Sequence, residues 1–153
     1  MIEKYSQRFD KYRCWDCSFL DMAETIAKKS KDPSTKVGAV IVDGQNRPVS
    51  WGYNGFPRGV EDSEKRLCNR QEKYDIIVHA EVNAIAFANK SVEGCTLYID
   101  PFEPCSRCAG IIIQNGIKRV VSYKNKNDRW EKDFSISRKL LTEAGLIVDY
   151  YDV

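Results

Sequence analysis

The only histidine of this 153-residue chain, His79, is followed two positions later by Glu81, and a Pro-Cys-Ser-Arg-Cys segment lies further on at 104–108. One imidazole and two thiolates suit Zn²⁺, and three protein ligands leave a fourth position open for water. Zinc lowers the pKa of bound water to around 7, and a glutamate beside that water can carry protons. We therefore predict one catalytic zinc ion per subunit, held by His79, Cys105 and Cys108, with Glu81 as the proton carrier.

The other cysteines leave an alternative without catalysis. A CxxC pair on its own is equally typical of a redox pair or half of a structural zinc site. Cys14 and Cys17 form a second pair, and two pairs can build a Cys₄ zinc ribbon, but the gap from Cys17 to Cys105 far exceeds the ~15–20 residues of such motifs. We interpret Cys14 and Cys17 as small, partly buried residues, and assign no role to Cys68 or Cys95.

The two chemical segments need a scaffold that brings them together. Apolar residues at helical spacing predict a helix over about 15–30, and two apolar runs, 37–42 and 48–53, flank a turn and predict a hairpin. The polar stretch 54–78 predicts a long loop with a short helix. Helices are then expected over 80–90, 105–115 and about 131–144, and strands over 96–100, 117–123 and 146–151. This order predicts an α/β fold in which a hairpin joins a parallel unit, with five strands and helices on both faces.

Length and composition indicate a soluble protein with a single domain spanning 1–153, because 42% of the residues are hydrophobic and 30% are charged, and the net charge is only +2. This charge gives no strong attraction to nucleic acid or membrane. No apolar run approaches the ~18 residues of a membrane span, and the charged N-terminus lacks the apolar core of a signal peptide. We expect a cytoplasmic protein with no nucleic-acid or membrane partner, whose six cysteines are ligands or thiols rather than disulfides.

Four stretches resemble the deoxycytidylate (dCMP) deaminases, a branch of the cytidine deaminase-like zinc enzymes. They are SKDPSTKVGAVIV (30–42), GYNGFPRG (52–59), EKYDIIVHAEVNAI (72–85) and PCSRCAGIIIQNGIKRVV (104–121). The HAE and PCxxC motifs belong to the whole superfamily, whereas GYNGxPxG and HAExNAI are more specific to the dCMP branch. The resemblance implies a three-layer α/β/α sandwich with a mixed five-stranded sheet, and hydrolytic deamination of dCMP to dUMP and ammonia for dTTP precursor supply. It also implies the same zinc ligands and the same role for Glu81.

Substrate residues follow partly from the resemblance. Asn54 matches the asparagine that holds the sugar, and Ala80, inside the HAE motif, is expected at the substrate. For the 5′-phosphate we predict Ser34, Thr35 and Lys36, just before the first strand, although Lys36 fits an exposed surface charge equally well. Tyr123 is a further candidate, because ligands of open α/β sheets bind at the carboxyl ends of strands.

Regulation is expected from the resemblance alone. Similar family members are commonly homohexamers that dCTP with Mg²⁺ activates and dTTP inhibits. The residues matching that effector site are Gly52, Tyr53, Asn54, Gly55, Arg58, Phe87 and Lys90. Relatives can carry arginine where this chain has Lys90. Cationic side chains suit polyphosphate, so Arg66, Arg70 and Lys73 join the candidates. Some relatives hold a second, structural zinc in the loop before HAE, but here that loop offers only Cys68.

Three other functions use a similar zinc core. A tRNA adenosine deaminase should carry a basic stripe, against which the net charge and GYNGFP both argue. A nucleoside or dCTP deaminase differs only in how the phosphate end is met, and the sequence leaves dCMP and dCTP open as substrates. A non-catalytic structural zinc module is disfavoured by the cysteine spacing.

Overall fold

The computed structural model describes residues 2–3 and 14–152, and these residues contain one six-stranded mixed sheet in the order β1-β6-β5-β4-β2-β3. Its strands are β1 (Ile2–Glu3), β2 (Gly38–Val42), β3 (Pro48–Tyr53), β4 (Thr96–Asp100), β5 (Arg119–Tyr123) and β6 (Ile147–Asp152). β2 runs antiparallel to β3 and β4, whereas β4, β5 and β6 are parallel, as predicted. The two-residue β1, parallel to β6, adds an edge strand to the five expected ones.

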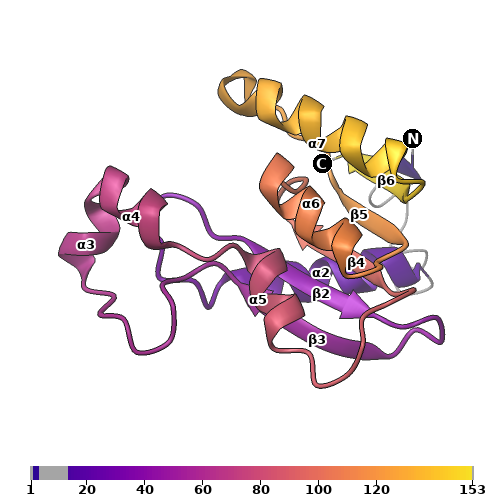
Figure 1. The fold of residues 1–153 in the computed structure, drawn as a ribbon, viewed down its shortest axis with the longest axis horizontal. Coiled ribbons are helices and arrows are strands. Elements are labelled where there is room, and N and C mark those ends of the chain that lie inside the picture. The colour runs from indigo at the N-terminus through magenta and orange to yellow at the C-terminus, as the bar shows by residue number, and fades with distance from the viewer. Residues whose placement is uncertain (1, 4–13, 153) are drawn as a thin grey trace.

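Helices cover both faces of the sheet, which confirms the three-layer α/β/α architecture (Figure 1). On one face lies α2 (Trp15–Ala27). On the other lie α5 (Ala80–Ala86), α6 (Ser106–Gln114) and α7 (Glu131–Glu143), the last preceded by the short 3₁₀ helix η1 (Asp128–Trp130). The long segment between β3 and α5 carries two short helices, α3 (Glu64–Cys68) and α4 (Arg70–Ile76), where we expected one. They project at one end of the view in Figure 1.

Strand β2 shows why the sheet has two cores. All five of its residues are buried. Ala39 and Ile41 pack with α5 and α6, while Val40 and Val42 pack with α2, because successive side chains of a strand point to opposite faces. At Gly38 a Cβ atom would lie 2.0 Å from the backbone oxygen of Ala23, so only glycine lets α2 approach this closely.

Two helices end earlier than their sequence patterns predict. α2 ends at Ala27 because the next residues turn, and the hydroxyl of Ser30 donates to the backbone oxygen of Asn54 at 2.8 Å. α5 ends at Ala86, and Phe87 is its C-cap, so the residues up to 90 form a turn. For α2, the contact with a distant segment overrides the local pattern.

Within the described residues, no helix has the length and apolarity needed to span a membrane. The sequence-based expectation about an N-terminal leader concerns residues 1–13, most of which lie outside the described part of the chain.

Candidate active site

The structure brings His79, Cys105 and Cys108 together, with one ligand atom of each lying within 4.8 Å of the others. Nδ1 of His79 is 3.5 Å from Sγ of Cys105 and 3.3 Å from Sγ of Cys108. His79 is the N-cap of α5, Cys105 is the N-cap of α6, and Cys108 lies in the first turn of α6. Two helix starts on one face of the sheet therefore present all three candidate metal ligands.

Helix α7 fixes the segment that carries the cysteines. Asp133 accepts hydrogen bonds from the backbone N–H of Ser106 at 2.9 Å and from its hydroxyl at 2.5 Å. Glu103 is almost fully buried and accepts three hydrogen bonds from the guanidinium of Arg138, at 2.6 to 3.1 Å. These bonds hold the chain on both sides of Cys105.

The hairpin fixes the position of His79. Gly55 and Val78 exchange two backbone hydrogen bonds, of 3.1 and 2.8 Å, and Val78 immediately precedes His79. At Gly52 a Cβ atom would lie 2.4 Å from the backbone nitrogen of Ala84 and 2.5 Å from the backbone oxygen of Ala80. Glycine at this position thus lets α5 lie directly on β3.

Glu81 is buried beside the ligand cluster. Its side chain accepts a hydrogen bond from the thiol of Cys108, with Sγ 3.7 Å from Oε2. Burial raises the pKa of Glu81, and the charge of His79 only partly opposes that shift. A carboxyl group with a raised pKa can both accept and donate a proton near neutral pH, as a proton carrier must.

The candidate ligands share protons among themselves. The hydrogen bond from Cys108 lowers the pKa of the Cys105 thiol to about 4, and the same bond raises the pKa of Cys108. The hydrogen bond to Cys105 raises the pKa of His79 to about 9, against the effect of burial. A metal requires neutral imidazole and thiolates, so its binding displaces protons from this cluster.

The donor set suits zinc. One imidazole nitrogen and two thiol sulfurs, presented within bonding reach of a common point, are ligands typical of Zn²⁺. Among the described residues they form the only cluster of at least three such side chains, so the structure offers one metal site there. With three protein ligands, the site keeps a position for a reacting molecule.

Comparison with known proteins identifies the family. The model of the cytidine and deoxycytidylate deaminase zinc-binding region matches residues 13–124. The chain belongs to this family. It is a zinc-binding deaminase, and its metal cluster lies within the matched region.

Several individual proteins are similar to this deaminase. It is 43% identical to an uncharacterized deaminase of Aliivibrio fischeri over 89% of the chain and 92% of that protein. It is 40% identical to the human deoxycytidylate deaminase over 82% of the chain and 74% of that protein. A solved apo dCMP deaminase from the cyanophage S-TIM5 has the same fold, with a TM-score of 0.70 and 24% identity over 90% of this chain and 96% of that one.

The candidate substrate residues separate into three groups. Asn54 and Ala80 are buried, and both lie next to the segments that carry His79. Ser34, Thr35 and Lys36 are exposed in the loop before β2, and the ammonium of Lys36 donates to the backbone oxygen of Ser30. The Tyr123 side chain is buried in the α2-facing cluster, whereas Ala80 and Cys108 belong to the cluster on the opposite face of the sheet.

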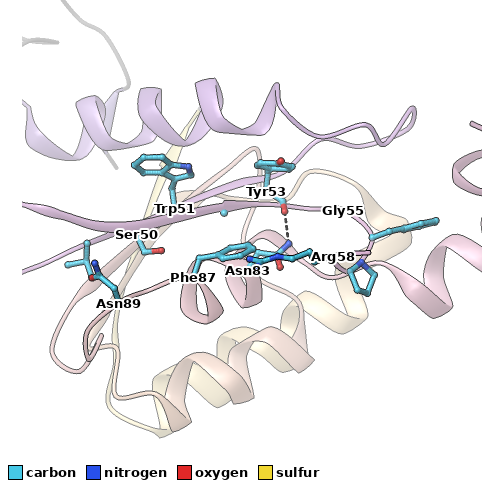
Figure 2. A pocket seen from close by; sticks show the side chains of 12 residues that line it. Ser50, Trp51, Tyr53, Gly55, Arg58, Asn83, Phe87 and Asn89 are labelled. Carbon is cyan, nitrogen blue, oxygen red and sulfur yellow. Dashed lines mark hydrogen bonds between the residues drawn. The ribbon is translucent and has the colours of Figure 1, made fainter. Parts of the chain in front are cut away.

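Most residues of the expected effector site line one pocket of about 570 Å³, at the edge strand β3 (Figure 2). They are Gly52, Tyr53, Gly55, Arg58 and Phe87. The guanidinium carbon of Arg58 lies 5.2 Å from the centroid of the Phe87 ring, and Asn83 donates a 2.8 Å hydrogen bond to the backbone oxygen of Tyr53. Asn54 and Lys90 do not line this pocket, and Lys90 lies 3.7 Å from Asp43.

The other cations nominated for polyphosphate lie elsewhere. Arg66 pairs with Glu72 at 2.6 Å, and Arg70 lies over the ring of Tyr74. Lys73 is buried and pairs with Asp32 at 3.0 Å. These three cations do not line the pocket, whereas Arg58 does.

The remaining cysteines lie outside the metal cluster. Sγ of Cys14 accepts a hydrogen bond from the backbone N–H of Cys17 at 3.3 Å and caps α2, which explains their spacing. Cys17 and Cys95 are buried, and Cys68 is exposed. The Cys₄ ribbon therefore finds no support, because Cys14 and Cys17 do not join Cys105 and Cys108.

Sequence reasoning missed the residues that support the site. Glu103, Asp133 and Arg138 lie outside the quoted motifs, and Asp32 lies in the stretch SKDPSTKVGAVIV but was given no role there. One signal was available for Glu103, which immediately precedes the Pro-Cys-Ser-Arg-Cys segment at 104–108. The partners of the other three are distant in sequence, so only the fold reveals them.

Proposed function

We propose that this deaminase converts dCMP and water into dUMP and ammonia. The observation that carries the proposal is a buried Glu81 beside the His79–Cys105–Cys108 cluster, in a chain 40% identical to the human deoxycytidylate deaminase. The specific stretches GYNGFPRG and HAEVNAI favour the same substrate.

Each active-site residue has a distinct task. When bound, Zn²⁺ supplies Lewis acidity that activates the attacking water. Glu81 takes a proton from that water and passes it to N3 of the cytosine as oxygen bonds to C4. Glu81 then takes the remaining proton from the new C4 hydroxyl and delivers it to the amino group, which leaves as ammonia as the C4–N bond breaks and the C4 carbonyl forms. Because Glu81 is buried, each proton that it carries is shielded from solvent during its transfer.

Other residues bind the parts of the nucleotide that do not react, the sugar and the 5′-phosphate. Asn54, adjacent to the backbone pair of Gly55 and Val78, is assigned to the sugar. Ser34, Thr35 and Lys36 are assigned to the 5′-phosphate, since they are exposed and lie in the loop that Asn54 contacts. We leave Tyr123 out of this assignment because its side chain packs on the α2 face.

One assay tests the substrate. Ammonia release is measured side by side with dCMP, deoxycytidine, dCTP and tRNA at equal zinc loading. We expect dCMP to have the highest kcat/KM. Equal values for dCMP and deoxycytidine would remove the phosphate site, and a preference for dCTP or tRNA would replace the proposed substrate.

We further propose that the pocket beside β3 binds a deoxynucleoside triphosphate with Mg²⁺. Its support is that five residues nominated from the sequence line one pocket, in which a cation and an aromatic ring are already in contact. From the family resemblance we expect a homohexamer that dCTP activates and dTTP inhibits. Each triphosphate can do this only if it binds one of two states of the assembly more tightly than the other. Titrating both triphosphates at sub-saturating dCMP, with the assembly mass measured by light scattering, tests regulation and oligomer together.

A further inference from the structure

Every polar atom of the buried Asn54 is hydrogen-bonded to the segment 30–37. Its backbone N–H donates to the oxygen of Val37 at 3.2 Å, and its backbone oxygen accepts from Ser30 at 2.8 Å. Its side-chain Oδ1 accepts from the N–H of Val37 at 2.9 Å. Its Nδ2 donates to the backbone oxygen of Thr35 at 2.9 Å and to Oδ2 of Asp32 at 3.4 Å.

This pattern leaves the Asn54 side chain one unused hydrogen-bonding position. An amide Nδ2 has two hydrogens, and both are engaged by Thr35 and Asp32. An amide oxygen has two lone pairs, and Val37 uses one of them. The side chain can therefore accept one more hydrogen bond at Oδ1 and has no donor left for a ligand.

Together with the backbone of Thr35 and Val37, Asp32 helps to fix which way round the amide lies. Its carboxylate only accepts hydrogen bonds, so it must face Nδ2 rather than Oδ1 of Asn54. Oδ1 of Asp32 is itself held by the backbone N–H groups of Ser34 at 2.8 Å and Thr35 at 3.2 Å, and by the ammonium of Lys73 at 3.0 Å. A flipped Asn54 would oppose two oxygens and leave the N–H of Val37 facing the amide nitrogen.

Lys73 extends this control from helix α4. The Lys73 and Asp32 side chains are only 6% and 5% exposed, so their ion pair lies in a setting that weakens electrostatic interactions much less than water does. Lys73 lies six residues before His79 in the chain, and Asn54 precedes the Gly55–Val78 backbone pair. The pair thus links the loop before β2, the GYNG loop and the approach to the candidate metal ligand.

We propose that Asp32 and Lys73 are positioning residues that hold Oδ1 of Asn54 as the acceptor for the 3′-hydroxyl of the nucleotide sugar. A 2′-deoxynucleoside 5′-phosphate has one free ring hydroxyl, at C3′, and this is the donor that a lone acceptor can meet. The inference rests on the proposed function and adds a basis for selecting the sugar. Neither residue touches the reacting atoms.

The test compares two substrates that differ at one atom, dCMP and 2′,3′-dideoxycytidine 5′-monophosphate. Wild type should favour dCMP in kcat/KM on the order of 10²-fold or more, because a site built around a hydroxyl rejects the analogue lacking it. Asp32→Asn replaces the acceptor-only partner of Nδ2 with a neutral amide, so one of the three contacts that oppose a flipped Asn54 is lost. This variant should lower kcat/KM for dCMP by roughly tenfold, mostly through KM, and leave the dideoxy substrate within about twofold, as expected for one lost hydrogen bond.

Two further variants keep the test decisive. Asp32→Asn alone leaves the Lys73 charge buried and unpaired, which lowers the fraction of folded protein. The double variant Asp32→Asn, Lys73→Met removes both charges and should restore that fraction. Its discrimination between the two substrates should stay low. Asp62→Asn is the matched control, since it removes an exposed pair with Lys31 on the same loop, and discrimination should remain at the wild-type value. Equal losses for both substrates in every folded Asp32 variant would make the network purely structural and overturn the proposal.

The same experiment separates this inference from the proposed function. Deoxycytidine and 2′,3′-dideoxycytidine are assayed in parallel. If only the nucleosides react, the proposed substrate is wrong, and the 3′-hydroxyl preference of the nucleoside pair still decides the role of Asp32. If the wild-type enzyme has equal kcat/KM for the substrates with and without the 3′-hydroxyl, the positioning role is refuted even when dCMP is the best substrate. If none of the four reacts, both proposals fail.

Discussion

The thiol of Cys108 donates a hydrogen bond to the carboxylate of Glu81, with 3.7 Å between sulfur and oxygen, so a candidate metal ligand and the proposed proton carrier are in contact. Replacing Glu81 with Gln keeps the shape of the side chain and removes its ability to accept a proton. We expect turnover to fall at least ~10²–10⁴-fold, the usual contribution of acid–base catalysis, with zinc content unchanged. Metal analysis and ammonia release check this, with His79→Ala as the variant that should lose zinc. Zinc lost from Glu81→Gln but retained by His79→Ala would reverse the two assignments.

Cys14→Ser and Cys17→Ser should leave the zinc content at one ion per chain. Cys14 caps α2, and serine is itself a good N-cap, so the substitution at 14 should change stability little. Elemental analysis of the purified variants is the measurement. A wild-type content near two ions per chain that drops to one in either variant would contradict our interpretation of this pair.

Asp133→Ala should loosen the segment that carries Cys105, because the carboxylate holds both the N–H and the hydroxyl of Ser106. We expect a loss of about 0.5–2 kcal/mol in the free energy of unfolding, the range for a removed helix cap, and faster release of zinc to a chelator. Denaturant unfolding and chelator competition measure the two effects. Asp128→Ala, at an exposed position in η1, is the control and should change neither.

Asp16 should make the stability of the fold depend on pH in the acid range. Burial opposes ionisation of Asp16, but hydrogen bonds from Arg119, Tyr98 and Tyr151, at 2.7 to 2.9 Å, outweigh it and lower its pKa. A carboxyl group with a lower pKa in the folded state stabilises the fold above its unfolded pKa, about 4. That contribution is lost as pH falls through the folded value.

Asp16→Asn should therefore cost roughly 1–3 kcal/mol at pH 7, because buried donors lose their charged acceptor. The difference between wild type and variant should shrink as pH falls below about 4. Denaturant unfolding at several pH values between about 3 and 7 measures it, with Asp75→Asn on the exposed side of α4 as the control. A difference that stays constant over this range would show that ionisation of Asp16 does not stabilise the fold.

Arg58→Ala should flatten the response to dCTP and dTTP while leaving the unregulated rate within about twofold. The cost of losing an exposed cation–π contact is small, about 0.5–1 kcal/mol, so an effect on regulation would come from the triphosphate rather than from misfolding. Arg70→Ala is the matched control, because Arg70 lies over Tyr74 and does not line the pocket. Equal losses in both variants, or none in either, would refute the assignment of this pocket to an effector.

Sequence patterns predicted the order of elements well because the central strands are buried on both faces and the motifs mark helix starts. They placed His79, Cys105 and Cys108 together before any geometry was known. They failed at the ends of α2 and α5, and near the end of α2 the partner of Ser30 is distant in the sequence. Tyr123 was expected near the substrate from its place at a strand end. Successive side chains of a strand point to opposite faces, and that of Tyr123 points to the α2 face.

The supporting network was invisible in the sequence for a similar reason. Asp32 and Lys73 both lie in stretches that resemble the deaminase family, but they are separated by 41 positions and nothing in the sequence pairs them. The composition counts charged residues but does not show which of them are buried as ion pairs. Arg66 and Arg70 show the converse, since their charge suggested a ligand and they contact neighbouring side chains instead.

Helix α5 is short, and it joins the candidate metal site to the pocket beside β3. It begins at the HAE motif and ends at Phe87 in the wall of the pocket, with Asn83 between them on the pocket side. Seven residues at 1.5 Å each make it about 10 Å long, and Gly52 seats it on β3 without an intervening side chain. In the regulation that we propose, a triphosphate that displaces Phe87 would displace the whole of this short helix, and with it His79 at the other end. Signal transfer between the two proposed sites then needs no relay of side chains through the core.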